Sequence, residues 1–173
     1  LTRLEKRGAT EKMRKVRQRC GEVWKYAIAT GRALSNPAPD LASVMMPHKK
    51  EHYAHLEVSE LSDFFTVLQA YTGNILVKLA MRLLILTGTR PGELRKAEWS
   101  EFDFENNLWS IPEERMKMRR PHLVPLSRQA LAILEELKTM TSGYQYVFPG
   151  RLEKVKPISD MSLNVLIRRV GYG

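Results

Sequence analysis

The sequence has one cysteine, no long apolar run and none of the common nucleotide-binding or zinc-binding signatures. With Cys20 alone, the 173-residue chain cannot form an internal disulfide, which excludes disulfide-stapled secreted scaffolds and favours the reducing cytoplasm. No apolar stretch reaches the roughly 18 to 20 residues that span a bilayer, so we expect no membrane partner. The absence of a P-loop, a dinucleotide-binding glycine pattern, a nucleophile elbow and paired cysteines removes support for most familiar enzyme classes.

Positive charge is in excess, and it is unevenly distributed along the chain. The formal net charge is +9, made up of +7 in residues 1–36, −3 in residues 37–112 and +5 in residues 113–173. Two basic segments that flank an acidic one predict attraction to DNA or RNA, with an affinity that falls as salt rises. The alternative is that these side chains form an ordinary solvated surface.

The first basic segment is predicted to be a helix. Apolar residues in the range 11–34 recur at spacings of three and four, which is typical of an amphipathic helix, while Arg14, Arg17 and Lys25 lie largely off that stripe. The stripe consists of Met13, Val16, Cys20, Val23, Trp24, Ala27 and Ile28.

A linker is predicted between two parts of the chain. Residues 46–56 have no consistent period and surround Pro47, so we expect residues 1–45 to form one helical part and residues 57–173 a second one. The chain begins at Leu1 without Met and stops after a helical pattern, so we expect it to be a piece of a longer protein.

The second part is predicted to combine helices with a small antiparallel sheet. We therefore expect a mainly helical α+β fold, in which Ser127 and Asp160 cap the last two helices. The expected helices cover 57–71, 75–86 and 94–99, and the expected strands cover 102–104, 108–111 and 122–125.

One arginine is predicted to have a rigid base. Arg90 follows an apolar helix within LTGTRPGELRKAEW (86–99), beside the turn residues Gly88 and Pro91. A guanidinium held in this way can bind two oxygens of one phosphate. The alternative is a purely structural pair between Arg90 and Glu93, three residues further on.

Three histidines have the spacing of a metal site. His48, His52 and His55 would share a helix face if their segment were helical. Because no fourth ligand accompanies them and Pro47 precedes them, we favour a solvated linker that faces phosphate and predict no metal.

Two stretches resemble the tyrosine recombinases, specifically the integrases of temperate phages and genomic islands. TGTRPGEL (87–94) matches the motif around that family's first catalytic arginine, and RMKMRRPHLVPLS (115–127) resembles its β-hairpin. Residues 16–41 are similar to the end of its DNA-clamping helical domain, so the resemblance covers nearly the whole chain. It implies a site-specific recombinase that cuts and rejoins double-stranded DNA at attachment sites, assembles as a tetramer and needs no metal or cofactor.

The resemblance also implies roles for individual residues. Arg90 would bind the scissile phosphate, Glu93 would support it from behind, and Lys117, eight residues before Pro125, would protonate the leaving 5′ oxygen. Other basic residues would contact DNA phosphates, and those in the hairpin also compete with Lys117 for its role. These residues are Arg14, Arg17, Lys25, Arg115, Arg119 and Arg120.

The family's remaining catalytic groups are not found. It requires a His-x-x-Arg and then a nucleophilic tyrosine, yet no histidine here is followed by arginine three residues on. We therefore assign no role as nucleophile to Tyr144, Tyr146 or Tyr172, and expect this piece to bind DNA without cutting it. The alternatives are a non-catalytic DNA-binding regulator and an RNA-binding module.

Overall fold

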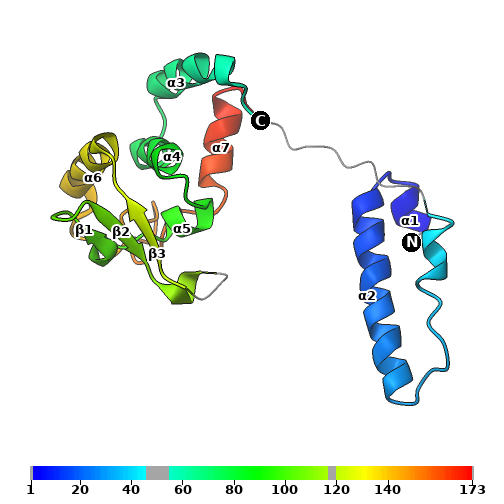
Figure 1. Ribbon diagram of the computed structural model, residues 1–173. Helices are drawn as coiled ribbons and strands as arrows, with labels where there is room; N and C mark the ends of the chain where they lie inside the picture. The colour runs from blue at the N-terminus through cyan, green and yellow to red at the C-terminus, as the bar shows by residue number, and fades with distance from the viewer. Residues whose placement is uncertain (1, 46–54, 117–119, 173) are drawn as a thin grey trace. The chain divides into compact units, whose positions relative to one another are not determined.

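The protein consists of two compact units. The computed structural model describes residues 2–45, 55–116 and 120–172 (Figure 1). The units cover Leu1–His55 and Leu56–Gly173, and most of the predicted linker lies outside the described residues. The expectation of a mainly helical α+β fold with a small antiparallel sheet is confirmed.

Unit 1 is built around one long helix. A short helix, α1 (Thr2–Glu5), precedes α2 (Thr10–Ala29), and a 3-10 turn, η1, covers Asp40–Ala42. The chain turns back after α2 at Gly31, whose φ of 69° favours glycine. Asn36 then holds the returning segment, because its side-chain amide donates to the Gly21 carbonyl at 3.3 Å and its oxygen accepts the Ala38 N–H at 3.0 Å.

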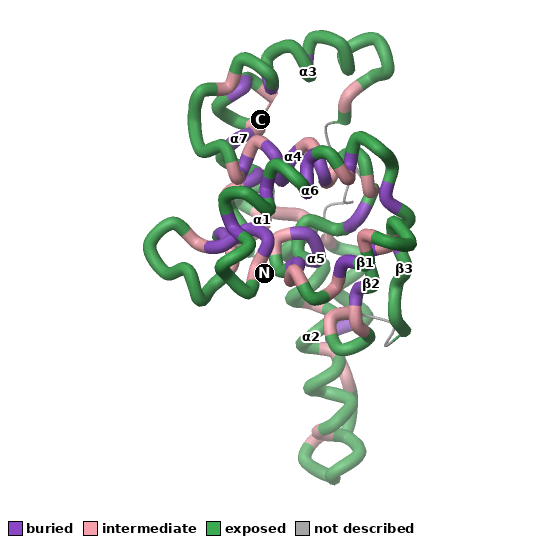
Figure 2. The backbone as a smooth tube through the Cα atoms, turned by 90° about the vertical axis from the view of Figure 1, so that its left-hand side faces the viewer, coloured by how far each residue is buried: buried purple, intermediate pink, exposed green. Residues whose placement is uncertain are grey.

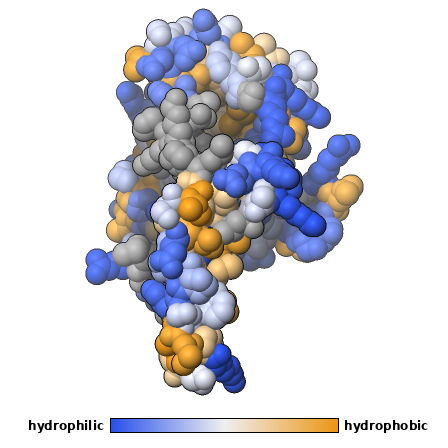
Figure 3. Space-filling view, turned by 90° about the vertical axis from the view of Figure 1, so that its right-hand side faces the viewer, coloured by the Kyte–Doolittle hydropathy of each residue, from blue (hydrophilic) through white to orange (hydrophobic). Residues whose placement is uncertain are grey.

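The predicted apolar stripe of α2 remains largely uncovered within the described residues. Met13 is the buried residue of this helix, whereas Val23 is 68% exposed and Trp24 is 39% exposed. Figure 3 shows apolar side chains, in orange, between the hydrophilic ones on the face that it draws. The spacing predicted the helix, but a spacing does not say what covers its apolar face.

Unit 2 has a helical core around α4. The helix α4 (Ile75–Thr87) contacts both α6 (Arg128–Thr141) and α7 (Ser162–Arg169), and Figure 2 shows the buried residues of these elements in purple. Asn74 begins α4 by accepting the Leu76 N–H at 2.9 Å, and Gly88 ends it with a φ of 62°. The helix α3 (Leu61–Ala70), preceded by the 3-10 turn η2 (Val58–Glu60), adds Phe64 and Leu68 to this core.

The sheet packs through the aromatic residues of its strands. Strands β1 (Phe102–Asp103), β2 (Leu108–Ile111) and β3 (His122–Pro125) pair antiparallel in that order. Trp109 faces Phe102 on one side and Val124 on the other, and all three are buried. The 3-10 turns η3 (Trp99–Glu101) and η4 (Glu113–Arg115) precede β1 and follow β2.

Two local predictions were wrong. The short helix α5 covers Pro91–Arg95 rather than 94–99, because Pro91 has a backbone suited to the first helical position. Asp160 does not cap α7, whose N-cap is Met161; the Ser159 hydroxyl accepts the Met161 N–H instead, at 3.2 Å. The cap at Ser127 is present, since its hydroxyl accepts the Ala130 N–H at 3.2 Å.

Candidate functional site

Arg90 lies in the turn between α4 and α5. It is the N-cap residue of α5, and the preceding Thr89 is buried and lies 3.0 Å, hydroxyl to hydroxyl, from Thr87 at the end of α4. At the other end of α5, the Arg95 guanidinium donates to the Ile158 carbonyl at 3.0 Å. The backbone of Arg90 is therefore held from both sides, as the sequence predicted.

Glu93 binds both the backbone and the side chain of Arg90. One carboxylate oxygen accepts the Arg90 N–H at 3.0 Å, and the other lies 2.5 Å from Nη1 of the guanidinium. The Glu93 side chain is only 7% exposed, whereas that of Arg90 is 65% exposed. The Arg90–Glu93 pair, which the sequence offered as an alternative, is therefore present, and the Arg90 guanidinium still faces solvent.

The pKa of Glu93 reflects two opposing effects. Burial acts to raise it, but the hydrogen bonds from the Arg90 side chain and backbone, together with the charges of Arg90 and His122, hold the pKa below its ordinary value. The carboxylate therefore stays ionised near neutral pH and keeps Arg90 paired.

Arg90 and Glu93 line an open hollow of about 420 Å³, which we call the Arg90 hollow. Its other walls come from the end of α4 and from the loop between β2 and β3. The full set of lining residues is Gly88, Thr89, Arg90, Glu93, Met116, Arg120, Pro121 and His122. The arrangement gathers positive charge on one concavity, which suits a phosphate group. Sequence reasoning gave His122 no role, although it begins the strand of the recognised hairpin.

The basic residues of the hairpin have different surroundings. Arg120 lines the Arg90 hollow, as a phosphate contact would. The prediction that Arg115 contacts a DNA phosphate does not fit the structure. Its guanidinium is largely buried and lies 2.5 Å from the Glu101 carboxylate. Lys117 and Arg119 lie outside the described residues.

The three predicted DNA contacts of unit 1 come together in one place. Arg14, Arg17 and Lys25 line a hollow of about 340 Å³ between α2 and the returning segment, which we call the α2 hollow. The guanidinium of Arg17 also donates to the Ala38 carbonyl at 3.3 Å, which fixes its direction. Glu22, which pairs with Arg19 at 2.8 Å, lines the same hollow, and its negative charge partly offsets the positive charge there.

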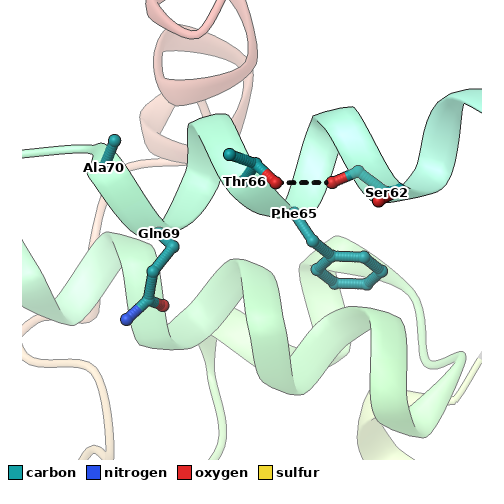
Figure 4. A pocket seen from close by; sticks show the side chains of 5 residues that line it. All are labelled: Ser62, Phe65, Thr66, Gln69 and Ala70. Carbon is teal, nitrogen blue, oxygen red and sulfur yellow. Dashed lines mark hydrogen bonds between the residues drawn. The ribbon is translucent and has the colours of Figure 1, made fainter.

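A third hollow is neutral. It measures about 660 Å³ and lies along α3 (Figure 4), where Phe65 and Gln69 point toward the same side. The Thr66 hydroxyl donates to the Ser62 carbonyl at 3.0 Å. Since no charged side chain among the described residues lines this hollow, it offers a phosphate nothing comparable to Arg90.

The tyrosines have contacts elsewhere. Tyr146 forms an isolated β-bridge with Glu98, Tyr144 lies under the Lys154 ammonium, and the Tyr172 ring packs edge-on against Phe64 at 5.2 Å. Among the described residues, the lining of the Arg90 hollow includes no tyrosine.

The described residues offer neither a metal cluster nor a membrane-spanning helix. His48 and His52 lie outside those residues, and within them no group of three or more His, Cys, Asp or Glu side chains could hold a metal ion. In the same residues, no helix is both long and apolar enough to cross a membrane.

Comparison with known protein families identifies the class. Residues 54–173 match the phage integrase family, and residues 1–44 match the phage integrase central domain. The chain therefore belongs to the phage integrase family, whose members are tyrosine recombinases. This membership does not favour the alternatives of a non-catalytic regulator or an RNA-binding module.

Curated relatives are about twice as long as this chain. The integrase of Shigella phage Sf6 is 40% identical over 173 residues, which cover 99% of this chain and 45% of that integrase. Prophage integrase IntS of Escherichia coli (strain K12) has the same identity and coverage. The chain thus spans about 45% of the length of these relatives.

Solved structures share the fold at low sequence identity. A lambda integrase tetramer bound to a Holliday junction matches with a TM-score of 0.75 and 20% identity, over 98% of this chain and 49% of that chain. The Tn1549 transposon integrase in complex with a circular intermediate DNA matches with a TM-score of 0.82 and 14% identity, over 98% of this chain and 60% of that one. The fold is therefore shared with these integrases.

Proposed function

We propose that this chain supplies part of the active site and part of the DNA-binding surface of a site-specific tyrosine recombinase. The whole protein would integrate or excise a mobile element through a 3′-phosphotyrosine intermediate, in the cytoplasm and as a tetramer on its attachment sites. The observation that carries the proposal is the Arg90 guanidinium, backed by buried Glu93 and exposed at a hollow shared with Arg120 and His122.

In this proposal the scissile phosphate occupies the Arg90 hollow. The planar fork of Arg90 binds two nonbridging oxygens, whose negative charge is stabilised as the phosphorus becomes five-coordinate. Glu93 keeps the fork oriented, and because it already holds one end, little side-chain entropy is lost on binding. Arg120 and His122 add positive or hydrogen-bonding groups at the rim.

Lys117 is proposed to protonate the leaving 5′ oxygen. Support comes from the resemblance of residues 115–127 to the family's hairpin, and from the described neighbours Met116 and Arg120, which both line the Arg90 hollow. An alkoxide is strongly basic and needs a proton as its bond to phosphorus breaks, which is the task of a general acid.

The chain by itself is proposed to bind DNA without cutting it. The nucleophilic tyrosine and the His-x-x-Arg of the family are proposed to lie in the part of the whole protein that this chain does not cover. Support comes from the coverage of the relatives and from the tyrosine contacts described above.

A nicked attachment-site duplex tests the proposal, because loss of the short strand beyond the nick traps any covalent adduct. The whole protein should give a protein-linked strand on a denaturing gel, and Arg90→Ala should abolish it. The 173-residue chain should shift the same duplex on a native gel and give no adduct. If the whole protein binds DNA but forms no linked strand, it is a binding protein; if the chain alone forms one, Tyr144, Tyr146 or Tyr172 is a nucleophile.

A further inference from the structure

The buried Arg115–Glu101 pair, which the proposed function leaves without a role, connects the hairpin loop to the Arg90 turn. The Arg115 side chain is 17% exposed and Glu101 only 9%, with 2.5 Å between Nη2 and the carboxylate. The same carboxylate oxygen accepts the indole N–H of Trp109 at 2.9 Å. Nη1 of Arg115 donates to the backbone carbonyl of Lys96.

These contacts join three elements through the Arg115 guanidinium and the Glu101 carboxylate. Lys96 is the C-cap of α5, the helix that begins at Arg90. Trp109 lies in the middle of the sheet on β2, fully buried, while Arg115 ends the 3-10 turn η4 that follows β2. A single planar fork therefore fixes the start of the loop between β2 and β3 against the far end of the Arg90 helix.

The described ends of the loop between β2 and β3 line the Arg90 hollow. Met116, the residue after Arg115, is packed against the core and lines the hollow, and Arg120, Pro121 and His122 line it from the other end of the loop. A shift of Arg115 would thus move the hollow wall relative to Arg90.

Stability alone does not explain this ion pair, because removing both charges from water costs free energy. Burial raises the pKa of Glu101, even though the Trp109 hydrogen bond and the Arg115 charge act to lower it. Nε of Arg115 is buried and has no hydrogen-bond partner among the described residues. Apolar residues of similar size often stabilise a core as well as a buried ion pair, but they cannot fix a direction as a two-armed fork does.

We propose that Arg115 and Glu101 are positioning residues, which fix Met116 and the start of the loop after β2 relative to Arg90 and thereby support proton transfer to the leaving 5′ oxygen. The inference rests on the proposed function. Arg115 is then not a phosphate contact, and its effect on the reaction is exerted through the loop. A displacement of about 1 Å at the donor is enough to cost on the order of 10²-fold in rate.

Leaving-group chemistry separates this role from simple stabilisation. The whole protein would be tested on an ordinary nicked attachment site and on one with sulfur at the scissile 5′ bridging position, where the thiolate departs without a proton. Arg115→Met removes the fork at similar length, and Glu101→Gln keeps an acceptor for Trp109 if the first variant folds poorly. Lys117→Ala and Arg90→Ala serve as references, and Arg128→Gln, an exposed residue at the start of α6, serves as the control.

Both pair variants should cleave ordinary DNA on the order of 10²-fold more slowly, bind it with unchanged affinity and salt dependence, and recover most of the rate on the sulfur substrate. Arg90→Ala should not recover. Equal slowing of cleavage on both substrates would show that the pair is merely structural. A DNA affinity that is weaker and less dependent on salt would show that Arg115 contacts a phosphate. Either result overturns the inference, as does a normal cleavage rate on ordinary DNA. Failure of the unmodified whole protein to form an adduct would instead refute the proposed function.

Discussion

At the residue scale, the structure separates arginines that look equivalent in the sequence. Arg90 could be predicted because its partner Glu93 is three residues away, within the turn that the Gly and Pro residues define. Arg115 could not, because Glu101 lies 14 residues away and comes into reach only through the sheet. A sequence motif can therefore identify a site residue whose partner is close in the sequence. A partner that is distant in the sequence can be identified only from the fold.

The exchange Arg90→Lys tests whether the planar fork matters. In the whole protein it should lower the cleavage rate by on the order of 10² to 10³, the scale for loss of one preorganised donor, with little change in DNA affinity. A lysine can hold a phosphate as a point charge but cannot bind two of its oxygens at once. Adduct formation on the nicked duplex measures the rate, with Arg128→Lys as the matched control. Normal cleavage by Arg90→Lys would make Arg90 a structural residue.

Glu93→Gln should lower stability in a pH-dependent way. The pKa of Glu93 is lowered in the folded chain, so its contribution is present above the unfolded-state pKa of about 4.3 and is lost as pH falls through the folded value. We expect Glu93→Gln to reduce the free energy of unfolding by about 1 kcal/mol at pH 7, because a charge-assisted hydrogen bond becomes a neutral one. Denaturant unfolding across pH measures the difference, which should shrink in acid.

The matched control is Glu135→Gln on the exposed face of α6. It should change stability little at any pH, because this carboxyl is not buried. A deficit for Glu93→Gln that stays constant down to about pH 2 would show that packing, rather than charge, is what Glu93 contributes.

At the element scale, regular patterns predicted which elements exist better than they predicted where the elements end. The strands at 108–111 and 122–125 were predicted at their observed bounds, because branched and aromatic residues alternate there between clear turns. Strand β1 stops at Asp103, one residue early, because this carboxylate accepts the backbone N–H groups of Glu105 and Asn106 and so forms a turn.

Helix caps offer a direct test of this difference. Ser127→Ala removes the hydroxyl that accepts the Ala130 N–H and should lower the free energy of unfolding by about 1 kcal/mol. Asp160→Ala should stay within about 0.5 kcal/mol, because Asp160 does not cap α7. Denaturant unfolding of both variants measures this, and a similar loss for the two would mean that α7 begins at Asp160 after all.

A pair of glycines tests a tight loop. A Cβ at Gly150 would lie 2.8 Å from the Glu153 carbonyl oxygen, whereas one at Gly143 would meet no heavy atom within 4 Å. Gly150→Ala should therefore destabilise the chain by about 1 to 3 kcal/mol, the usual range for overpacking. Gly143→Ala should be neutral or slightly stabilising in the same denaturant titration. Equal effects would contradict the close approach at Gly150.

At the scale of the whole molecule, charge is placed on both units although they are built differently. Unit 1 has few buried apolar residues and presents Arg14, Arg17 and Lys25 around one hollow, while unit 2 has a closed core and presents Arg90 and Arg120 around another. Charge counts along the sequence predicted both basic segments but not the hollows, since each hollow combines residues from distant parts of its unit. Each unit therefore presents a basic hollow of its own.

The dependence of DNA affinity on salt tests the contribution of unit 1. Each phosphate contact releases condensed counterions, so the logarithm of the affinity of the chain for duplex DNA should fall linearly with the logarithm of salt concentration. Arg14→Gln, in the α2 hollow, should weaken binding and make that slope shallower by about one unit. Lys15→Gln lies next in sequence on the same helix, but Lys15 pairs with Glu11 at 2.7 Å and does not line the hollow, so its slope should match the unmodified chain. Equal effects of the two variants would mean that unit 1 attracts DNA by diffuse charge and that the α2 hollow is not a phosphate site.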